Sequence, residues 1–302
     1  VSVYNETEIP ALFVDGETVR SGPDFLVTSN DFRYVPAGCD GLTDPNCPPG
    51  KFRFSYQEVD FDVLFRNDKE LFLDCKKEMM GLICLENCAG SGPVDIWYGE
   101  SREEALDKEN CELTDRLILP QKSRPDVSKA FRYVLLRAEN ADLSAVEILR
   151  EFHPQERSSR FSCSDPRLEK IYSIALDTLA LNTREFFLDG IKRDRWLWAG
   201  DAYQSFLMNY YTFFDLKTAR RTMIALAGKP PILHFMNQIM EYSFYWIIGL
   251  YDYYMYTGDL FFLRRMLPTA KRIIEFSHTR KTADGLLEGK EGDWVFVDWA
   301  NL

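Results

Sequence analysis

The pattern of apolar and polar positions changes near the middle of the chain. Before about residue 152, short apolar runs are separated by turn residues, which is typical of an antiparallel β-sandwich. After about residue 160, apolar residues recur every three or four positions, which predicts helices. The predicted strands are 52–56, 71–73, 80–85, 94–98, 117–119, 131–136 and 144–149. The predicted helices are one that begins at 165–166 and four more at 193–211, 214–228, 237–257 and 259–280.

Cap residues support the helical half. Asp165 can cap free amide groups and Pro166 can occupy the first turn, where it needs no hydrogen-bond partner. Gly258 can end one helix and Asp259 can begin the next. The polar segment 154–160 precedes the first helix and indicates a domain boundary. We therefore expect a sandwich over residues 1–158 and helical hairpins over 159–302.

Charge and composition exclude several classes of function. The net charge is −11, from 36 basic and 47 acidic residues, so nucleic acid is not an expected partner. Aromatic residues make up 14% of the chain, which suits bulky core packing or a carbohydrate cleft. The longest apolar run, near 244–250, is too short to span a bilayer, and no signal peptide is recognised at the first residues. The compartment stays open, with a periplasmic or secreted location favoured over the cytoplasm.

Cysteine and histidine spacing gives no reason to expect a metal or another cofactor. The three histidines are far apart and the seven cysteines include no CxxC pair. Cys39 and Cys47 bracket a loop and could form a disulfide, whereas Cys75, Cys84 and Cys88 fit small buried apolar positions. The sequence does not indicate an oligomeric state.

The segment 189–201 combines three carboxylates, three cations and two tryptophans. A helix beginning near Arg193 would place Asp194, Trp198 and Asp201 on one face, with Asp189 in the preceding turn. Paired carboxylates beside an aromatic ring are typical of sugar sites, because carboxylates bind hydroxyl groups and aromatic rings cover apolar sugar faces. The other interpretation is an ordinary cluster of ion pairs at a helix N-terminus.

The motif Asp-Gly-x-Lys-Arg-Asp-Arg-x-x-Trp-x-Gly-Asp at 189–201 resembles the active-site signature of the α-L-rhamnosidases, glycoside hydrolase family 78. The resemblance implies that Asp194 is the general acid and that Asp189 and Asp201 bind the sugar. Many relatives have Glu as the acid, so a shorter side chain stands here. Short segments at 73–81, 98–101, 131–133, 242–246 and 256–259 also resemble family segments in the family's order. The implied fold is a β-sandwich followed by part of an (α/α)6 toroid.

The resemblance extends to a second group of candidate residues. The segment 292–299 resembles a family segment that faces the sugar, which makes Asp293, Trp294, Asp298 and Trp299 candidates for substrate binding. An alternative of equal weight is that this segment is a loop whose tryptophans are buried and do not bind a sugar. Arg193 and Trp198 complete the expected substrate-binding set, with Trp198 covering the sugar face or its methyl group. Arg193 and Arg195 also oppose a proton on Asp194, so their placement matters.

The resemblance implies hydrolysis of terminal α-L-rhamnosides with inversion, on a glycan or small rhamnoside substrate. Inversion needs a second carboxylate about 6.5–9.5 Å from the acid. In the family this base is a Glu of the second half of the toroid, expected beyond Leu302, so this chain could be inactive by itself. A non-catalytic carbohydrate-binding or scaffold protein is the alternative. A polysaccharide lyase is a third option, which the negative charge disfavours because lyase substrates are anionic.

Overall fold

The computed structural model describes residues 12–14, 17–19, 31–34, 50–228, 231–290 and 293–294. Cys39, Cys47, Asp298 and Trp299 lie outside these ranges. Near the N-terminus four short strands form one antiparallel sheet in the order β2-β1-β3-β4. They are β1 (Leu12–Val14), β2 (Glu17–Val19), β3 (Asp31–Tyr34) and β4 (Gly50–Arg53).

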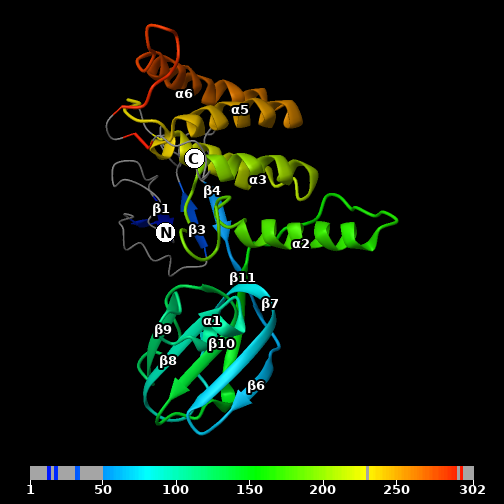
Figure 1. The fold of residues 1–302 in the computed structure, drawn as a ribbon, viewed down its shortest axis with the longest axis vertical. Coiled ribbons are helices and arrows are strands. Elements are labelled where there is room, and N and C mark those ends of the chain that lie inside the picture. Colours follow the sequence, from blue (N-terminus) through cyan, green and yellow to red (C-terminus); the bar gives the residue numbers. More distant parts are fainter. Residues whose placement is uncertain are drawn as a thin grey trace.

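A larger antiparallel sheet of seven strands follows, in the order β5-β11-β7-β10-β8-β9, with β6 also paired to β7. Its strands are β5 (Ser55–Glu58), β6 (Asp62–Arg66), β7 (Glu70–Cys84), β8 (Gly92–Gly99), β9 (Leu113–Leu119), β10 (Lys129–Ala138) and β11 (Glu147–Phe152). The first half of β7 pairs with β6 and its second half pairs with β11. Because the long strand β7 takes part in both pairings, the sheet curls around its apolar core (Figure 1).

The core of this sheet follows from alternating apolar positions. Leu73, Ile83, Ile96, Val134 and Ile148 are all fully buried in it. The prediction of an antiparallel β unit is therefore confirmed, while its strand limits need three corrections.

The first correction concerns β7, for which the pattern predicted two strands. Lys76 has a φ of 69° at the bend, and the exposed lysines there interrupt the apolar pattern without ending the strand. The predicted strand 52–56 is instead divided between β4 and β5. The strand predicted from Ser144 begins only at Glu147, because Asp142 accepts the Ser144 amide and starts a 3-10 turn. The pattern also did not predict β6 or the short helix α1 (Arg102–Leu106).

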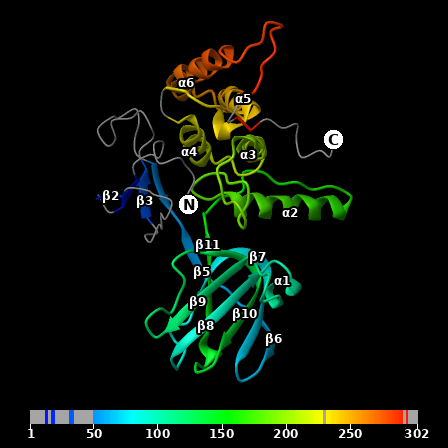
Figure 2. The same ribbon diagram turned by 60° about the vertical axis from the view of Figure 1, so that its left-hand side comes forward.

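Five longer helices form the second half. They are α2 (Pro166–Asn182), α3 (Ala199–Tyr211), α4 (Leu216–Ala227), α5 (Met240–Thr257) and α6 (Leu260–His278). Asp165 caps α2 and Asp259 caps α6, as predicted, and Gly258 ends α5 with a φ of 67°. In both ribbon views α2 lies between the curled sheet and the other helices (Figures 1 and 2).

The helices α3 to α6 share an aromatic-rich core. Phe206, Trp246 and Tyr253 are almost fully buried there, and the Trp246 indole donates a hydrogen bond to the Met223 carbonyl. The all-round apolar pattern of α5 predicted a fully buried helix, and this was wrong. Its Met255 is 60% exposed, because the described helices cover only one side of α5. Completion of these helices into an (α/α)6 toroid stays a prediction.

Candidate active site

The segment that carries Asp194 is a closed loop and not the start of a helix. The Asp189 carboxylate accepts a hydrogen bond from the Trp196 amide at 2.7 Å, and the Asp189 amide donates to the Trp196 carbonyl at 3.1 Å. Arg195 has a φ of 48°, which no α-helix allows. Helix α3 therefore begins only at Ala199, and the predicted helical face of Asp194, Trp198 and Asp201 was wrong.

Two cations attach this 189–196 loop to the curled sheet. Lys192 forms an ion pair with Glu104 of α1 and lies 3.8 Å from Glu100 and 3.9 Å from Glu112. Arg195 donates a hydrogen bond from Nη1 to the Ser128 carbonyl at 3.0 Å. The sheet therefore fixes the position of the loop that holds the candidate acid.

A side chain from a distant segment caps helix α3. Asn237 accepts the Ala199 amide with its Oδ1 at 3.0 Å and donates its Nδ2 to the Leu197 carbonyl at 3.0 Å. This places Asp201 in the first turn of the helix, where the helix dipole favours a negative charge. No local pattern could predict this contact, because the partners are far apart along the chain.

The three carboxylates of the motif lie close enough to affect one another. Burial raises the pKa of Asp189, and the charge of Asp194 raises it further. Burial also raises the pKa of Asp201, with smaller contributions from Asp189 and Asp194. The loop and the helix start therefore gather the three predicted residues without placing them on one helix.

The two arginines that flank Asp194 differ in their placement. Arg193 is 81% exposed and contacts Asp194 through one atom pair, Nε to Oδ1, at 3.2 Å. An exposed single contact of this kind is worth about 0–1 kcal/mol. Arg195 points to the sheet instead. Asp194 itself is 38% exposed, so no bidentate clamp closes it off.

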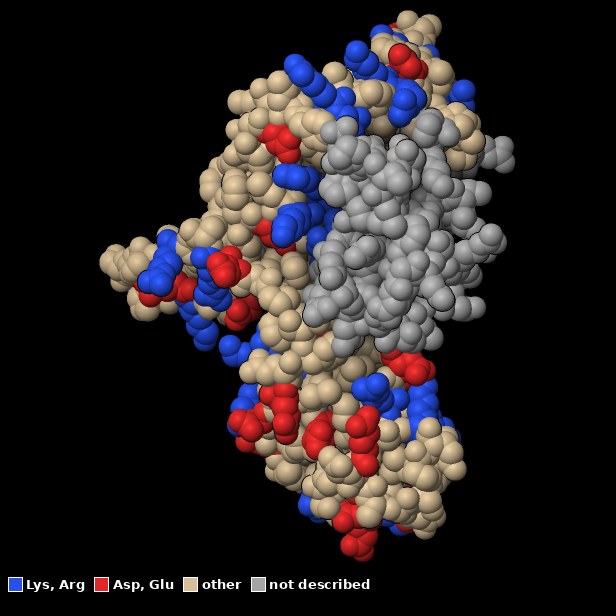
Figure 3. Space-filling model, turned by 180° about the vertical axis from the view of Figure 1, so that it is seen from behind, with Lys and Arg blue, Asp and Glu red and all other residues tan. Residues whose placement is uncertain are grey.

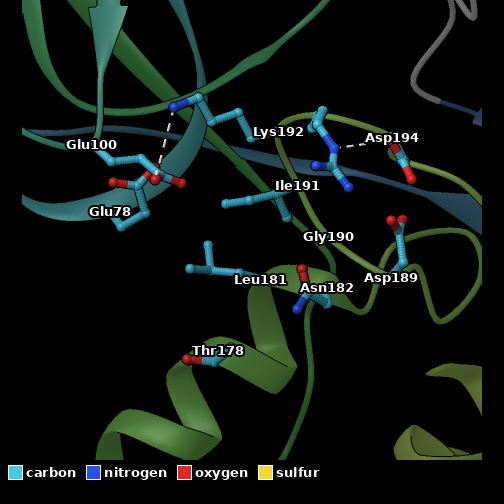
Figure 4. Close-up of a pocket in the computed structure, with 11 residues that line it drawn as sticks. Glu78, Glu100, Thr178, Leu181, Asn182, Asp189, Gly190, Ile191, Lys192 and Asp194 are labelled. Carbon is cyan, nitrogen blue, oxygen red and sulfur yellow. Dashed lines mark hydrogen bonds and ion pairs between the residues drawn. The ribbon is translucent and has the colours of Figure 1, made fainter. Parts of the chain in front are cut away.

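A cavity of about 500 Å³ lies beside the loop (Figure 4). Asp189 and Asp194 lie at one end, and Glu78 and Glu100 of the sheet unit lie at the other. The remaining lining residues come from the loop and from the C-terminal end of α2: Gly190, Ile191, Lys192, Arg193, Thr178, Leu181 and Asn182. The candidate acid therefore borders an open space that the sheet and the helices form together.

Trp198 belongs to a cluster of aromatic rings. The ring centroids of Trp196, Tyr242 and Trp294 lie 6.5, 6.2 and 6.0 Å from it. Gly200 permits this packing, because a Cβ atom there would lie 2.7 Å from the Tyr242 ring. Trp294 is 44% exposed, so the cluster reaches the surface. Tyr242 was not predicted as a site residue, although it begins one of the family-like segments.

Asp293, from the second predicted group, has a different environment. Asp293 is only 4% exposed and forms an ion pair with Arg280 at 3.1 Å, and it does not line the cavity. Asp298 and Trp299 lie outside the described residues. Glu78 lines the cavity but was not predicted as a site residue, since its short β pattern resembles that of any scaffold strand.

The described residues lack two further features. No three His, Cys, Asp or Glu side chains are grouped so that they could hold a metal ion. None of the described helices has the length and apolar character needed to span a membrane.

Both halves of the chain match models of known protein families. Residues 1–136 match the model described as alpha-rhamnosidase-like, bacteroidetes, N-terminal. Residues 156–302 match the model of the bacterial alpha-L-rhamnosidase 6 hairpin glycosidase domain. The chain belongs to the α-L-rhamnosidase family. The resemblance seen in the 189–201 motif is thereby confirmed at the level of the family.

Solved rhamnosidase structures share the fold of this chain. A rhamnosidase from Klebsiella oxytoca, solved with rhamnose bound, has 24% identity and a TM-score of 0.65 over 80% of this chain and 54% of its own. A family 78 rhamnosidase from Bacillus sp. GL1 has 22% identity and a TM-score of 0.62 over 79% of this chain and 27% of its own. The chain thus spans about half or less of the length of these proteins. No curated protein matches the sequence.

Proposed function

We propose that the protein takes part in hydrolysis of terminal α-L-rhamnosides with inversion at the anomeric carbon, and that Asp194 is the general acid. The observation that carries the proposal is the position of Asp194 at an open cavity, close enough to Asp189 and Asp201 that its charge contributes to the raised pKa of both. Membership of the rhamnosidase family supports the choice of sugar.

Asp194 would protonate the glycosidic oxygen as the bond to the leaving group breaks. Its exposure and its single contact with Arg193 leave the carboxyl group accessible from the cavity. The Arg195 guanidinium binds the Ser128 carbonyl of the sheet unit and not the Asp194 carboxylate.

Asp189, Asp201 and Arg193 would bind sugar hydroxyl groups, and Trp198 would cover the apolar face or the methyl group of rhamnose. The ring cluster around Trp198 packs against this indole, which suits a rigid platform. The general base that inversion requires, about 6.5–9.5 Å from the acid, is not assigned to a described residue.

The direct test uses the complete natural protein and p-nitrophenyl α-L-rhamnoside. Proton NMR of the first product identifies its anomer, and inversion predicts that β-L-rhamnose forms first. The matching p-nitrophenyl β-D-glucoside serves as the control for sugar specificity. Initial release of α-L-rhamnose would overturn inversion. Rhamnose binding in calorimetry without any turnover would support the non-catalytic alternative instead.

A further inference from the structure

The cavity does not end at the sugar-binding motif. It continues from Asp194 past Gly190 and Ile191 to the sheet, where Glu78 of β7 and Glu100 after β8 form its far wall (Figure 4). A general acid lies beside the oxygen that joins the sugar to its leaving group. The space beyond Asp194 is therefore adjacent to the position where a leaving group begins.

Glu78 stands out in this wall because one of its carboxyl oxygens lacks a hydrogen-bond partner among the described residues. Its Oε1 atom is buried and has no hydrogen-bond partner within the described part of the chain. The charge of Lys192 acts on Glu78, but this cation is already shared among Glu104, Glu100 and Glu112. A buried polar atom without a partner costs roughly 1–3 kcal/mol, so a ligand that supplies the partner would recover that free energy.

The Glu78 carboxyl is neutral at neutral pH. Burial, and after it the charge of Glu100, raises the pKa of Glu78 to about 8. Glu104 also raises this pKa, whereas Lys192 and Arg132 lower it. A protonated carboxyl group both donates and accepts hydrogen bonds, as a sugar hydroxyl group does.

The other lining residues indicate the class of leaving group. Asn182 and Thr178 are polar, Leu181 and Ile191 are apolar, and no lining residue is aromatic. Alternating polar and aliphatic groups fit a ring with hydroxyl groups at its edge and C–H groups on its face. A flat aromatic leaving group would instead call for a stacking partner. At this end of the cavity the carboxylates of Glu100, Glu104 and Glu112 outnumber the Lys192 cation that they share, so an anionic sugar would be repelled there.

We infer that this end of the cavity binds the leaving group, that the leaving group is a neutral saccharide, and that Glu78 exchanges hydrogen bonds with one of its hydroxyl groups. The inference rests on the proposed function, since it uses Asp194 to define where the leaving group begins. Glu78 is a residue for substrate specificity in this account and takes no part in the proton transfer.

The test compares two substrates in the complete natural protein. The first is α-L-rhamnosyl-(1→6)-D-glucose, which places a hexose in the cavity, and the second is p-nitrophenyl α-L-rhamnoside. Glu78→Ala is expected to lower kcat/KM for the disaccharide by up to about 10-fold, because one hydrogen bond is worth about 0.5–1.5 kcal/mol and about 1.4 kcal/mol is a factor of 10. The value for the aryl substrate is expected to change less than about twofold.

Two variants control this comparison. Glu78→Gln retains a donor and an acceptor and is expected to keep disaccharide activity within about threefold of the wild type. Glu103→Ala removes an exposed carboxylate of α1 that does not line the cavity, and it is expected to leave kcat/KM unchanged for both substrates. If Glu78→Ala does not fold, the test instead compares the pH dependence of KM for the disaccharide between the wild type and Glu78→Gln. The wild-type KM for the disaccharide should rise above pH 8, where Glu78 ionises, and that of Glu78→Gln should not.

Calorimetry separates this inference from the proposed function. In an Asp194→Asn background, Glu78→Ala should weaken binding of the disaccharide by up to about 10-fold and leave binding of methyl α-L-rhamnoside unchanged. This result can be obtained without turnover, whereas the proposed function fails when the wild type does not hydrolyse either substrate. Equal effects of Glu78→Ala on both ligands, or no effect on either, would overturn the role of Glu78.

Discussion

Two carboxyl groups in the curled sheet show that the role of a buried acid depends on its hydrogen-bond partners. Glu151 of β11 accepts hydrogen bonds from Tyr56 and Ser128 and forms an ion pair with Arg184. Glu78 of β7 has an Oε1 atom without a partner among the described residues, and burial raises its pKa to about 8. The same residue type is therefore part of the scaffold at one position and a candidate ligand contact at the other.

The raised pKa of Glu78 predicts a pH-dependent stability. The folded protein keeps this proton up to about pH 8, whereas the unfolded chain releases it near the ordinary value of 4.5. Its contribution to stability is therefore complete below about pH 4.5 and is lost as pH rises through 8.

Glu78→Gln has no titrating group at this position. As the pH rises from 5 to 8.5, its free energy of unfolding should therefore increase relative to that of the wild type. The gain should reach a few kcal/mol, because a difference of one in pKa corresponds to about 1.4 kcal/mol. Urea unfolding at both pH values measures it. A constant difference between the two proteins would contradict the assignment.

Helix starts show which local features a sequence reveals. Helices α2 and α6 begin with an aspartate that caps its own helix, so both starts could be predicted from neighbouring residues. Helix α3 receives its cap from Asn237, and the residues before it are held in a loop by the Asp189 carboxylate. Both contacts depend on the folded chain, so the predicted start at Arg193 was six residues too early.

The Asn237 cap can be tested by substitution. Asn237→Ala removes both hydrogen bonds to the start of α3 and places alanine at a φ of 52°, which asparagine tolerates better. We expect a loss of about 1–3 kcal/mol in the free energy of unfolding. Chemical denaturation measures it.

Asn237→Asp retains the acceptor for the Ala199 amide and serves as the matched control. It should lose less stability than the alanine variant. An alanine variant as stable as the wild type would show that the cap does not hold the start of α3.

The same limits apply to the candidate site. Asp189, Asp194, Asp201 and Trp198 could be predicted because one short motif contains them all. Tyr242 reaches Trp198 from another helix, so no local pattern could have predicted that contact. For the second predicted group, Asp293 pairs with Arg280 and Asp298 lies outside the described residues, so substrate binding by these residues stays a prediction.

At the scale of the whole molecule, the sheet and the helices meet through buried charges. Arg184, which follows α2, forms an ion pair with Glu151 and donates a hydrogen bond to its carbonyl at 3.2 Å. Its guanidinium also lies 4.0 Å from the centroid of the Phe54 ring. On the face that Figure 3 shows, acidic side chains gather on the sheet and basic side chains on the helices beyond α2. The division of the chain at 158/159 stays a prediction.

Substitution of Arg184 tests this junction. Arg184→Leu leaves the Glu151 carboxylate buried without its cation, which is expected to cost about 3–5 kcal/mol. Arg137→Leu is the control, because it breaks a pair with Glu139 whose side chains are 43% and 44% exposed and should cost less than about 1 kcal/mol. Urea unfolding of both variants measures the difference. Equal losses would mean that the junction does not depend on the buried pair.

We propose above that Asp194 donates a proton to the leaving group. If so, the loss of kcat/KM in Asp194→Asn must depend on how much protonation the leaving group needs. The measurement is kcat/KM of the wild type and of Asp194→Asn in the complete natural protein, on p-nitrophenyl and on methyl α-L-rhamnoside. Nitrophenolate leaves without much help from an acid, whereas methoxide does not. The account predicts that Asp194→Asn lowers the rate on the methyl glycoside by about 10²–10⁴-fold and the rate on the aryl glycoside far less. An equal loss on both substrates, or no loss on either, would contradict it.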